Sequence, residues 1–152
     1  GALVLPGEPA FELRARADRI DRLAGGDYEI IDYKTGAVPA MKDVNSGLSP
    51  QLSLEAAMIR EGAFGALEPA AVSALTYWRL SGGDPPGQAR AAGDDPEKLA
   101  ADALEGLRRL IDFYDAAGTA YRARPDPDIA PRHNDYDHLE RIQEWASAGG
   151  GE

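Results

Sequence analysis

Two runs of alternating side chains, joined by a glycine turn, constrain the fold of this chain more than any other feature. Residues 11–18 read FELRARAD, residues 28–35 read YEIIDYKT, and Gly25 and Gly26 lie between them. Successive side chains of a strand point to opposite faces, and a short connection that contains glycine joins antiparallel neighbours. The stretch therefore predicts a β-hairpin.

Charged side chains are expected to converge at the open end of this hairpin. Asp32 and Lys34 are two residues apart, so they lie on one face of their strand and Tyr33 lies on the other. If a loop of three residues, 24–26, joins the runs, Asp18 lies directly opposite Asp32. A register slip of one residue would move that side chain to the other face. Two carboxylates and a lysine at one point favour a bound ligand, and a divalent, oxygen-binding cation is the natural candidate.

The order of these residues resembles the PD-(D/E)xK nuclease superfamily, in which an aspartate on one strand is followed by Asp-x-Lys on the next. The segments ADRID, IIDYKTG and PQLSLEAAM look more narrowly like its RecB-like branch. Within that branch they are most similar to the C-terminal nuclease domain of bacterial AddB proteins. The resemblance is carried by residues 11–60. It implies an α/β fold with a restriction-endonuclease-like core, a central mixed β-sheet flanked by helices on both faces.

The resemblance also implies a role for each site residue. Asp18, Asp32 and the backbone carbonyl of Tyr33 would hold Mg²⁺, for which Mn²⁺ can substitute. Lys34 would orient the attacking water and offset the charge that develops on the phosphate. Gln51 matches the glutamine of the family's QL motif, beside the active site. From the residues alone, the competing interpretation is a solvent-facing Asp–Lys pair, with Asp18 paired to an arginine and Gln51 an ordinary residue of a first helical turn.

Two positions depart from the common family pattern. Glu55 stands where the family often has tyrosine, one turn after the glutamine, and Ala15 stands where glycine is frequent. Neither change removes a metal ligand, although Glu55 puts the usual substrate contact in doubt. The family's upstream ligand, on a first helix, has no candidate here, because Glu8 and Glu12 are too close to the strand. We therefore expect a fragment of a larger protein that lacks this helix and is weakly active or inactive alone.

Other polar residues are interpreted as structural. Asp21 is three residues from Asp18, so it is expected on the opposite face of the strand, in an ion pair with Arg19 or Arg22. His133 and His138 are flanked by acidic residues but lack a convincing third ligand. We expect these histidines in a surface loop and at a helix cap.

Composition limits the class of protein. A chain of 152 residues fits one domain, and its net charge of −10 argues against a free-standing DNA-binding protein. That objection weakens if other domains grip the strand. The absence of cysteine excludes disulfides, thiolate zinc sites and a cysteine-ligated iron–sulfur cluster. No apolar run approaches the length of about 18 residues that a membrane helix needs, and no signal-peptide pattern is present. We expect a protein of the bacterial cytoplasm.

The remaining segments predict a single domain, 1–152, of mixed strands and helices. Residues 3–80 would hold the catalytic strands and helix, and residues 96–146 the C-terminal helices. In order, the segments are an irregular lead-in (3–10), a loop (36–47), a helix from Ser49 and Pro50 to Arg60 that Gly62 ends, a strand (70–80), a mobile loop (81–95), a helix (96–117), a loop (122–134), a helix (136–146) and a disordered tail (147–152).

These expectations lead to one principal function and two competitors. The principal one is a metal-dependent DNA exonuclease domain of an AddAB/RecBCD-type helicase–nuclease, which processes double-strand breaks for recombinational repair. Its partners would be the DNA strand that emerges from a helicase and an AddA-type subunit. The first competitor is a catalytically decayed module with the same fold, which docks on the subunits of such a complex. The second is a nuclease for another nucleic acid, such as RNA or a CRISPR intermediate.

Overall fold

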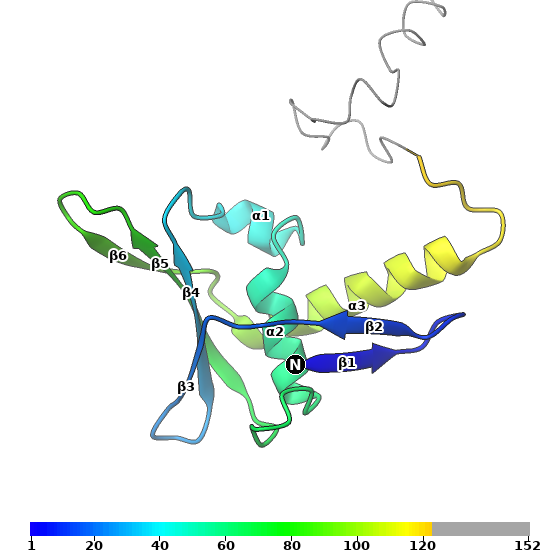
Figure 1. Cartoon of the computed structure of the whole chain (residues 1–152), viewed down its shortest axis with the longest axis horizontal. Coiled ribbons are helices and arrows are strands. Elements are labelled where there is room, and N and C mark those ends of the chain that lie inside the picture. Colours follow the sequence, from blue (N-terminus) through cyan, green and yellow to red (C-terminus); the bar gives the residue numbers. More distant parts are fainter. Residues whose placement is uncertain (123–152) are drawn as a thin grey trace, which may run out of the picture. The chain divides into compact units, whose positions relative to one another are not determined.

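Four strands form the main sheet of the computed structural model, which describes residues 1–122 (Figure 1). Along the sheet they are β3 (Arg19–Arg22), β4 (Tyr28–Lys34), β5 (Val72–Leu80) and β6 (Gly87–Ala91). β4 and β5 are parallel, whereas the other neighbours are antiparallel, so the sheet is mixed. Parallel strands need a crossover connection, and here it contains α1 (Met41–Asn45) and α2 (Gln51–Arg60). The chain divides into two compact units, Gly1–Asp115 and Ala116–Glu152, and every element described here belongs to the first.

The predicted hairpin is confirmed in its loop and its register. β3 pairs with β4 from Arg19 opposite Ile31 to Arg22 opposite Tyr28, which places position 18 opposite position 32. The loop consists of residues 24–26, as expected. It is closed by a 2.8 Å hydrogen bond from the Leu23 N–H to the carbonyl oxygen of residue 27. A positive φ of 95° at residue 26 is a conformation that glycine adopts without strain.

The first run is not one strand, however. β2 covers Phe11–Arg14, and β3 begins only at Arg19. The break has a local cause, because an Asp18 carboxylate oxygen accepts the Tyr33 N–H at 3.0 Å, in place of a strand carbonyl. Aspartate side chains often compete with backbone groups in this way.

A separate two-stranded sheet precedes the hairpin, so the prediction of an irregular lead-in was wrong. β1 (Ala2–Leu5) pairs antiparallel with β2, with Leu5 opposite Phe11. The prolines of this region lie in the connection, 6–10, and therefore interrupt no ladder bond. This ribbon is tied to the end of α3 (Pro96–Asp115) by a 2.9 Å bond from the Glu8 N–H to Asp115 Oδ2.

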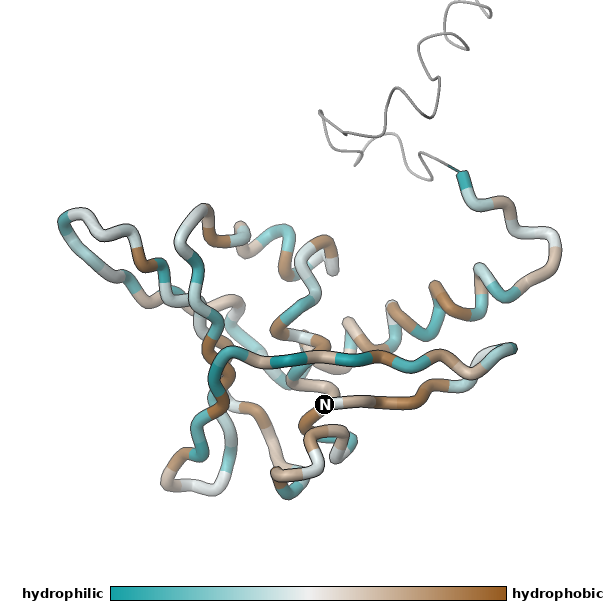
Figure 2. Tube along the Cα trace, viewed as in Figure 1, coloured by the Kyte–Doolittle hydropathy of each residue, from teal (hydrophilic) through white to brown (hydrophobic). Residues whose placement is uncertain are grey.

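One face of the main sheet supports the hydrophobic core. Tyr28 and Ile30 of β4 and Leu75 and Tyr77 of β5 point to this face. All three helices of the described chain contribute to the same cluster, with buried apolar residues from α1 (Val44), α2 (Leu52, Ala56, Ala57, Ile59) and α3 (Leu99, Ala100, Leu104, Ile111). Along α3, apolar positions recur in each turn with hydrophilic positions between them, which is the pattern of an amphipathic helix (Figure 2). Within residues 1–122, helices thus cover one face of the sheet, where the family resemblance implied both.

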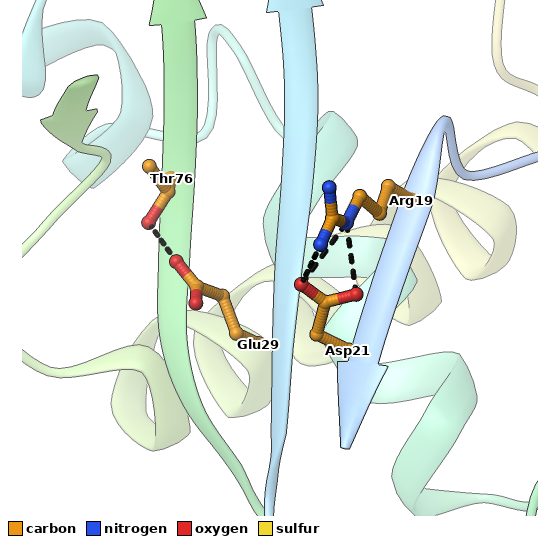
Figure 3. A network of polar contacts seen from close by, with 4 residues as sticks. All are labelled: Arg19, Asp21, Glu29 and Thr76. Carbon is orange, nitrogen blue, oxygen red and sulfur yellow. Dashed lines mark hydrogen bonds and ion pairs between the residues drawn. The ribbon is translucent and has the colours of Figure 1, made fainter. Parts of the chain in front are cut away.

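The opposite face of the sheet carries polar pairs (Figure 3). Arg19 Nε donates to both carboxylate oxygens of Asp21, at 2.8 and 3.0 Å, which confirms the predicted ion pair. This contact lowers the pKa of the Asp21 carboxyl. Thr76 Oγ1 donates to Glu29 Oε1 at 2.7 Å and so joins β5 to β4. Asp21 is therefore paired with Arg19, on the face of the sheet opposite to that of Asp18.

The other segment predictions had mixed outcomes. The predicted mobile loop contains β6, because a tight turn over residues 81–86 brings residues 87–91 back along β5. The loop 36–47 contains the short helix α1, and α2 begins at Gln51, with Pro50 rather than Ser49 at the N-cap position. Gly62, with a φ of 72°, follows α2 as predicted. The predicted helix 136–146, the tail 147–152 and both histidines lie outside the described residues.

Candidate active site

Three of the predicted site residues are brought together where β4 ends under the start of α2. Asp32 and Lys34 share the core-facing side of β4 with Ile30, and Asp32 is only 2% exposed. Gln51 is the first residue of α2, and the packing of α2 on the sheet brings its side chain over Asp32. The three residues are 17 to 19 positions apart between strand and helix, so the tertiary fold creates their contact.

A closed set of polar contacts links these three side chains. Gln51 Nε2 donates a hydrogen bond to Asp32 Oδ1 at 2.8 Å, and Lys34 Nζ donates one to Gln51 Oε1 at 3.2 Å. Lys34 Nζ also lies 2.8 Å from Asp32 Oδ2, which makes an ion pair. The angles of this last contact do not meet those of a hydrogen bond, so Asp32 Oδ2 has an ion-pair partner but no hydrogen-bond partner within the described chain. The structure therefore places Gln51 in contact with both Asp32 and Lys34.

Asp18, the residue just before β3, contacts the backbone next to this group. It is exposed, and its carboxylate accepts the Tyr33 N–H at 3.0 Å. The bond holds the Asp18 carboxylate against the peptide group that links Asp32 to Tyr33. The Tyr33 side chain points to the other face and is 40% exposed, as alternation predicts. The alternative in which Asp18 pairs with an arginine finds no support in these contacts.

Glu55 lies beside these residues, although the sequence pattern did not identify it as a candidate site residue. It lies one turn after Gln51 on α2, on the same helix face, and is only 3% exposed. Burial raises the pKa of its carboxyl, and the negative charges of Asp32 and Asp18 raise it further, whereas the neighbouring Gln51 side chain lowers it. Its Oε2 has no hydrogen-bond partner within the described chain. The spacing of four residues from Gln51 was the available signal.

Tyr77 closes the floor of the site. It is 1% exposed, and the Lys34 Nζ lies 5.9 Å from the centroid of its ring. Burial, together with the charges of Asp32 and Glu55, raises the pKa of the Tyr77 hydroxyl to about 12. The phenol is therefore neutral across the physiological range.

The chemistry of these donors fits a hydrated divalent cation. Asp18 and Asp32 supply two carboxylates, and Asp32 Oδ2 and Glu55 Oε2 are buried oxygens without a hydrogen bond from any residue of 1–122. Within residues 1–122, no three His, Cys, Asp or Glu side chains are close enough to hold a metal ion together. Mg²⁺ usually keeps several waters and uses only one or two carboxylates, so this donor set suits it better than a cation that needs an all-protein cage.

The comparison with known families decides the class of this protein. A family model of the PD-(D/E)XK nuclease superfamily matches residues 2–134. The chain belongs to this superfamily. The mixed sheet flanked by helices agrees with the restriction-endonuclease-like fold of PD-(D/E)XK proteins, which confirms the predicted fold class. No helix within residues 1–122 is both long and apolar enough to cross a membrane.

Curated relatives share only a short segment with this PD-(D/E)XK chain. Uncharacterized proteins of Rickettsia typhi and Rickettsia bellii are each 48% identical over 48 residues, and one of Rickettsia conorii is 46% identical over 48 residues. The matched segment is 32% of this chain and 6% of each relative. No solved structure matches the chain. The family model indicates a nuclease, and none of the comparisons reaches the AddB assignment.

Proposed function

We propose that this chain is a metal-dependent DNA nuclease domain that hydrolyses phosphodiester bonds. The observation that carries the proposal is the convergence of Asp18, Asp32, Lys34 and Gln51 at one end of β4, in a chain of the PD-(D/E)XK superfamily. A solvent-facing Asp–Lys pair would need none of these contacts. The burial of Asp32 in contact with Lys34 and the Gln51 amide supports a preorganised active site.

Each residue has a role that its position supports. Asp18, Asp32 and the Tyr33 carbonyl would hold Mg²⁺ or Mn²⁺, which when bound neutralises phosphate charge and activates water. Lys34 would sit beside the scissile phosphate, since its side chain keeps 30% exposure while it contacts Asp32. An ammonium at this place offsets negative charge that develops in the transition state. Gln51 would hold the Asp32 carboxylate and the Lys34 ammonium in fixed positions.

The biological setting is proposed from the RecB-like segments around these residues. We infer an exonuclease domain of an AddAB/RecBCD-type complex in the bacterial cytoplasm, closest to AddB. It would act on the DNA strand that leaves a helicase, with an AddA-type subunit as partner, in the repair of double-strand breaks by recombination. The net charge of −10 supports a domain that relies on other parts of a larger protein to hold DNA.

A second candidate is a catalytically decayed module that docks within the same complex. The observation that favours it is Glu55, which puts a buried carboxylate where the family often has tyrosine. A decayed module would have lost its affinity for divalent cations, whereas a nuclease would keep it. Cation binding therefore separates the two candidates independently of catalytic rate.

The test of the principal function is cleavage of end-labelled single-stranded DNA with Mn²⁺ or Mg²⁺ by the 152-residue chain and two variants. Lys34→Ala removes the proposed catalytic lysine, and Lys42→Ala removes an exposed lysine of α1 as a matched control. We expect cation-dependent cutting that Lys34→Ala abolishes and Lys42→Ala leaves intact. Cutting that survives Lys34→Ala would refute the role of that lysine. If no protein cuts and Mn²⁺ does not bind, the decayed module is the better assignment.

A further inference from the structure

Glu55 occupies a position that the contacts of the protein alone do not explain. Its side chain is 3% exposed, and its Oε2 has no hydrogen-bond partner within the described chain. A buried charged oxygen without a partner is strongly unfavourable, so such groups are normally paired or coordinate a metal. A structural role in the core would be filled at lower cost by an apolar residue.

The surroundings of Glu55 are short of positive charge. The charges of Asp32, Asp18 and Lys34 and the side chain of Gln51 all act on Glu55. Among these groups of the described chain, three carboxylates stand against one ammonium, which leaves an excess of two negative charges when all three acids are ionised. The neutral phenol of Tyr77 adds no charge to this balance. A single divalent cation would neutralise the excess.

We propose that Glu55 is the third carboxylate of the cation site, and that its Oε2 accepts a hydrogen bond from the water shell of a bound divalent ion. This inference rests on the proposed function, which places the cation at Asp18 and Asp32. Binding through water agrees with the arrangement within residues 1–122, where no three acidic side chains are close enough for direct ligation. Mg²⁺ retains several waters when a protein supplies few ligands.

The alternative role for Glu55 is to orient Gln51 alone. Its carboxylate and that of Asp32 both interact with the Gln51 side chain, and together they would keep the amide oxygen toward Lys34. In that case the effect of Glu55 on cation binding would pass through Gln51. A Gln51→Ala background removes this route and separates the two roles.

The test is Mn²⁺ binding by the 152-residue chain, measured by electron paramagnetic resonance of free Mn²⁺ and by the Mn²⁺-induced rise in Tm. We compare Glu55→Gln with Glu61→Gln, an exposed glutamate just beyond the end of α2. Groups that contact a metal through its ligands typically change affinity by about 10- to 100-fold. We expect Kd for Mn²⁺ to rise at least about tenfold in Glu55→Gln, also in the Gln51→Ala background, and to stay unchanged in Glu61→Gln.

Several outcomes would overturn the inference, and they differ from failure of the proposed function. A Kd within about twofold of wild type in Glu55→Gln overturns it, as does an effect that vanishes in the Gln51→Ala background. If Glu55→Gln does not fold, Glu55→Ala is judged by the same criterion, because it removes the carboxylate without burying an amide in its place. If the wild-type chain and Asp32→Asn both fail to bind Mn²⁺, this inference and the cation site of the proposed function are both refuted. Wild-type binding that Asp32→Asn abolishes and Glu55→Gln retains refutes the role of Glu55 alone.

Discussion

Replacing Lys34 by methionine tests whether the buried Asp32 carboxylate depends on its lysine. The Asp32 side chain is 3% exposed and Lys34 Nζ lies 2.8 Å from its Oδ2. Removing one partner of a buried ion pair costs about 3–5 kcal/mol, because the other charge stays buried. The Lys34 side chain is 30% exposed and Asp32 keeps its bond from Gln51, so we expect a smaller loss, about 2 kcal/mol. That loss corresponds to a fall in Tm of about 4–8 °C.

The assay for this prediction is urea denaturation of the metal-free chain at neutral pH, followed by circular dichroism. Lys42→Met, on the exposed side of α1, is the control and should change the free energy of unfolding by less than about 0.5 kcal/mol. In an Asp32→Asn background, the effect of Lys34→Met should largely disappear, because no buried charge is left unpaired. A full loss that persists in that background would refute the reasoning, as would no loss at all.

Two further predictions concern the hairpin loop and the buried glutamate. Gly26→Ala should destabilise the chain by about 1 kcal/mol, because φ is 95° there; the loss should be no larger, since no atom of the described chain lies within 4 Å of the new Cβ. Gly25→Ala should cost less than about 0.5 kcal/mol in the same urea titration. Equal losses for the two variants would contradict the argument from φ. Burial and the charges of Asp32 and Asp18 raise the pKa of Glu55, so the native state binds its proton more tightly than the unfolded chain. The metal-free protein should therefore lose stability as pH rises from the ordinary glutamate pKa of 4.5 through the raised value, and Glu55→Gln should lack this slope. Parallel stability profiles for the two proteins would contradict it.

The sequence predictions were accurate where a periodic pattern or a turn residue specifies the local structure. The loop at residues 24–26 and the pairing of positions 18 and 32 were predictable, because alternation and the glycine turn specify them within about 20 residues. The helix from residue 96 was predictable from its apolar period, and it ends at residue 115 rather than 117. The break before Arg19 was not predictable, since it depends on the Asp18 side chain bonding the Tyr33 backbone across the hairpin.

Strands that depend on a partner were missed. β1 is a strand because β2 lies beside it, and β6 is a strand because β5 offers it a free edge. The sequence of β6, GQARA, has no β-branched or aromatic residue, so its propensity indicates nothing. Pairing energy supplied by the neighbouring strand decides such segments, and the turn residues between the two strands conceal that neighbour in the sequence.

For the candidate site, the sequence by itself determined which side chains share a strand face and which helix residues lie one turn apart. Those are consequences of the periods of strand and helix, so Asp32 with Lys34 and Gln51 with Glu55 follow from spacing. Only the tertiary structure decided that the first turn of α2 lies over the end of β4, where Gln51 contacts both Asp32 and Lys34. It also decided that Glu55 is buried and that its Oε2 receives no hydrogen bond from the described part of the chain, because burial depends on what packs around a residue and no local pattern specifies it.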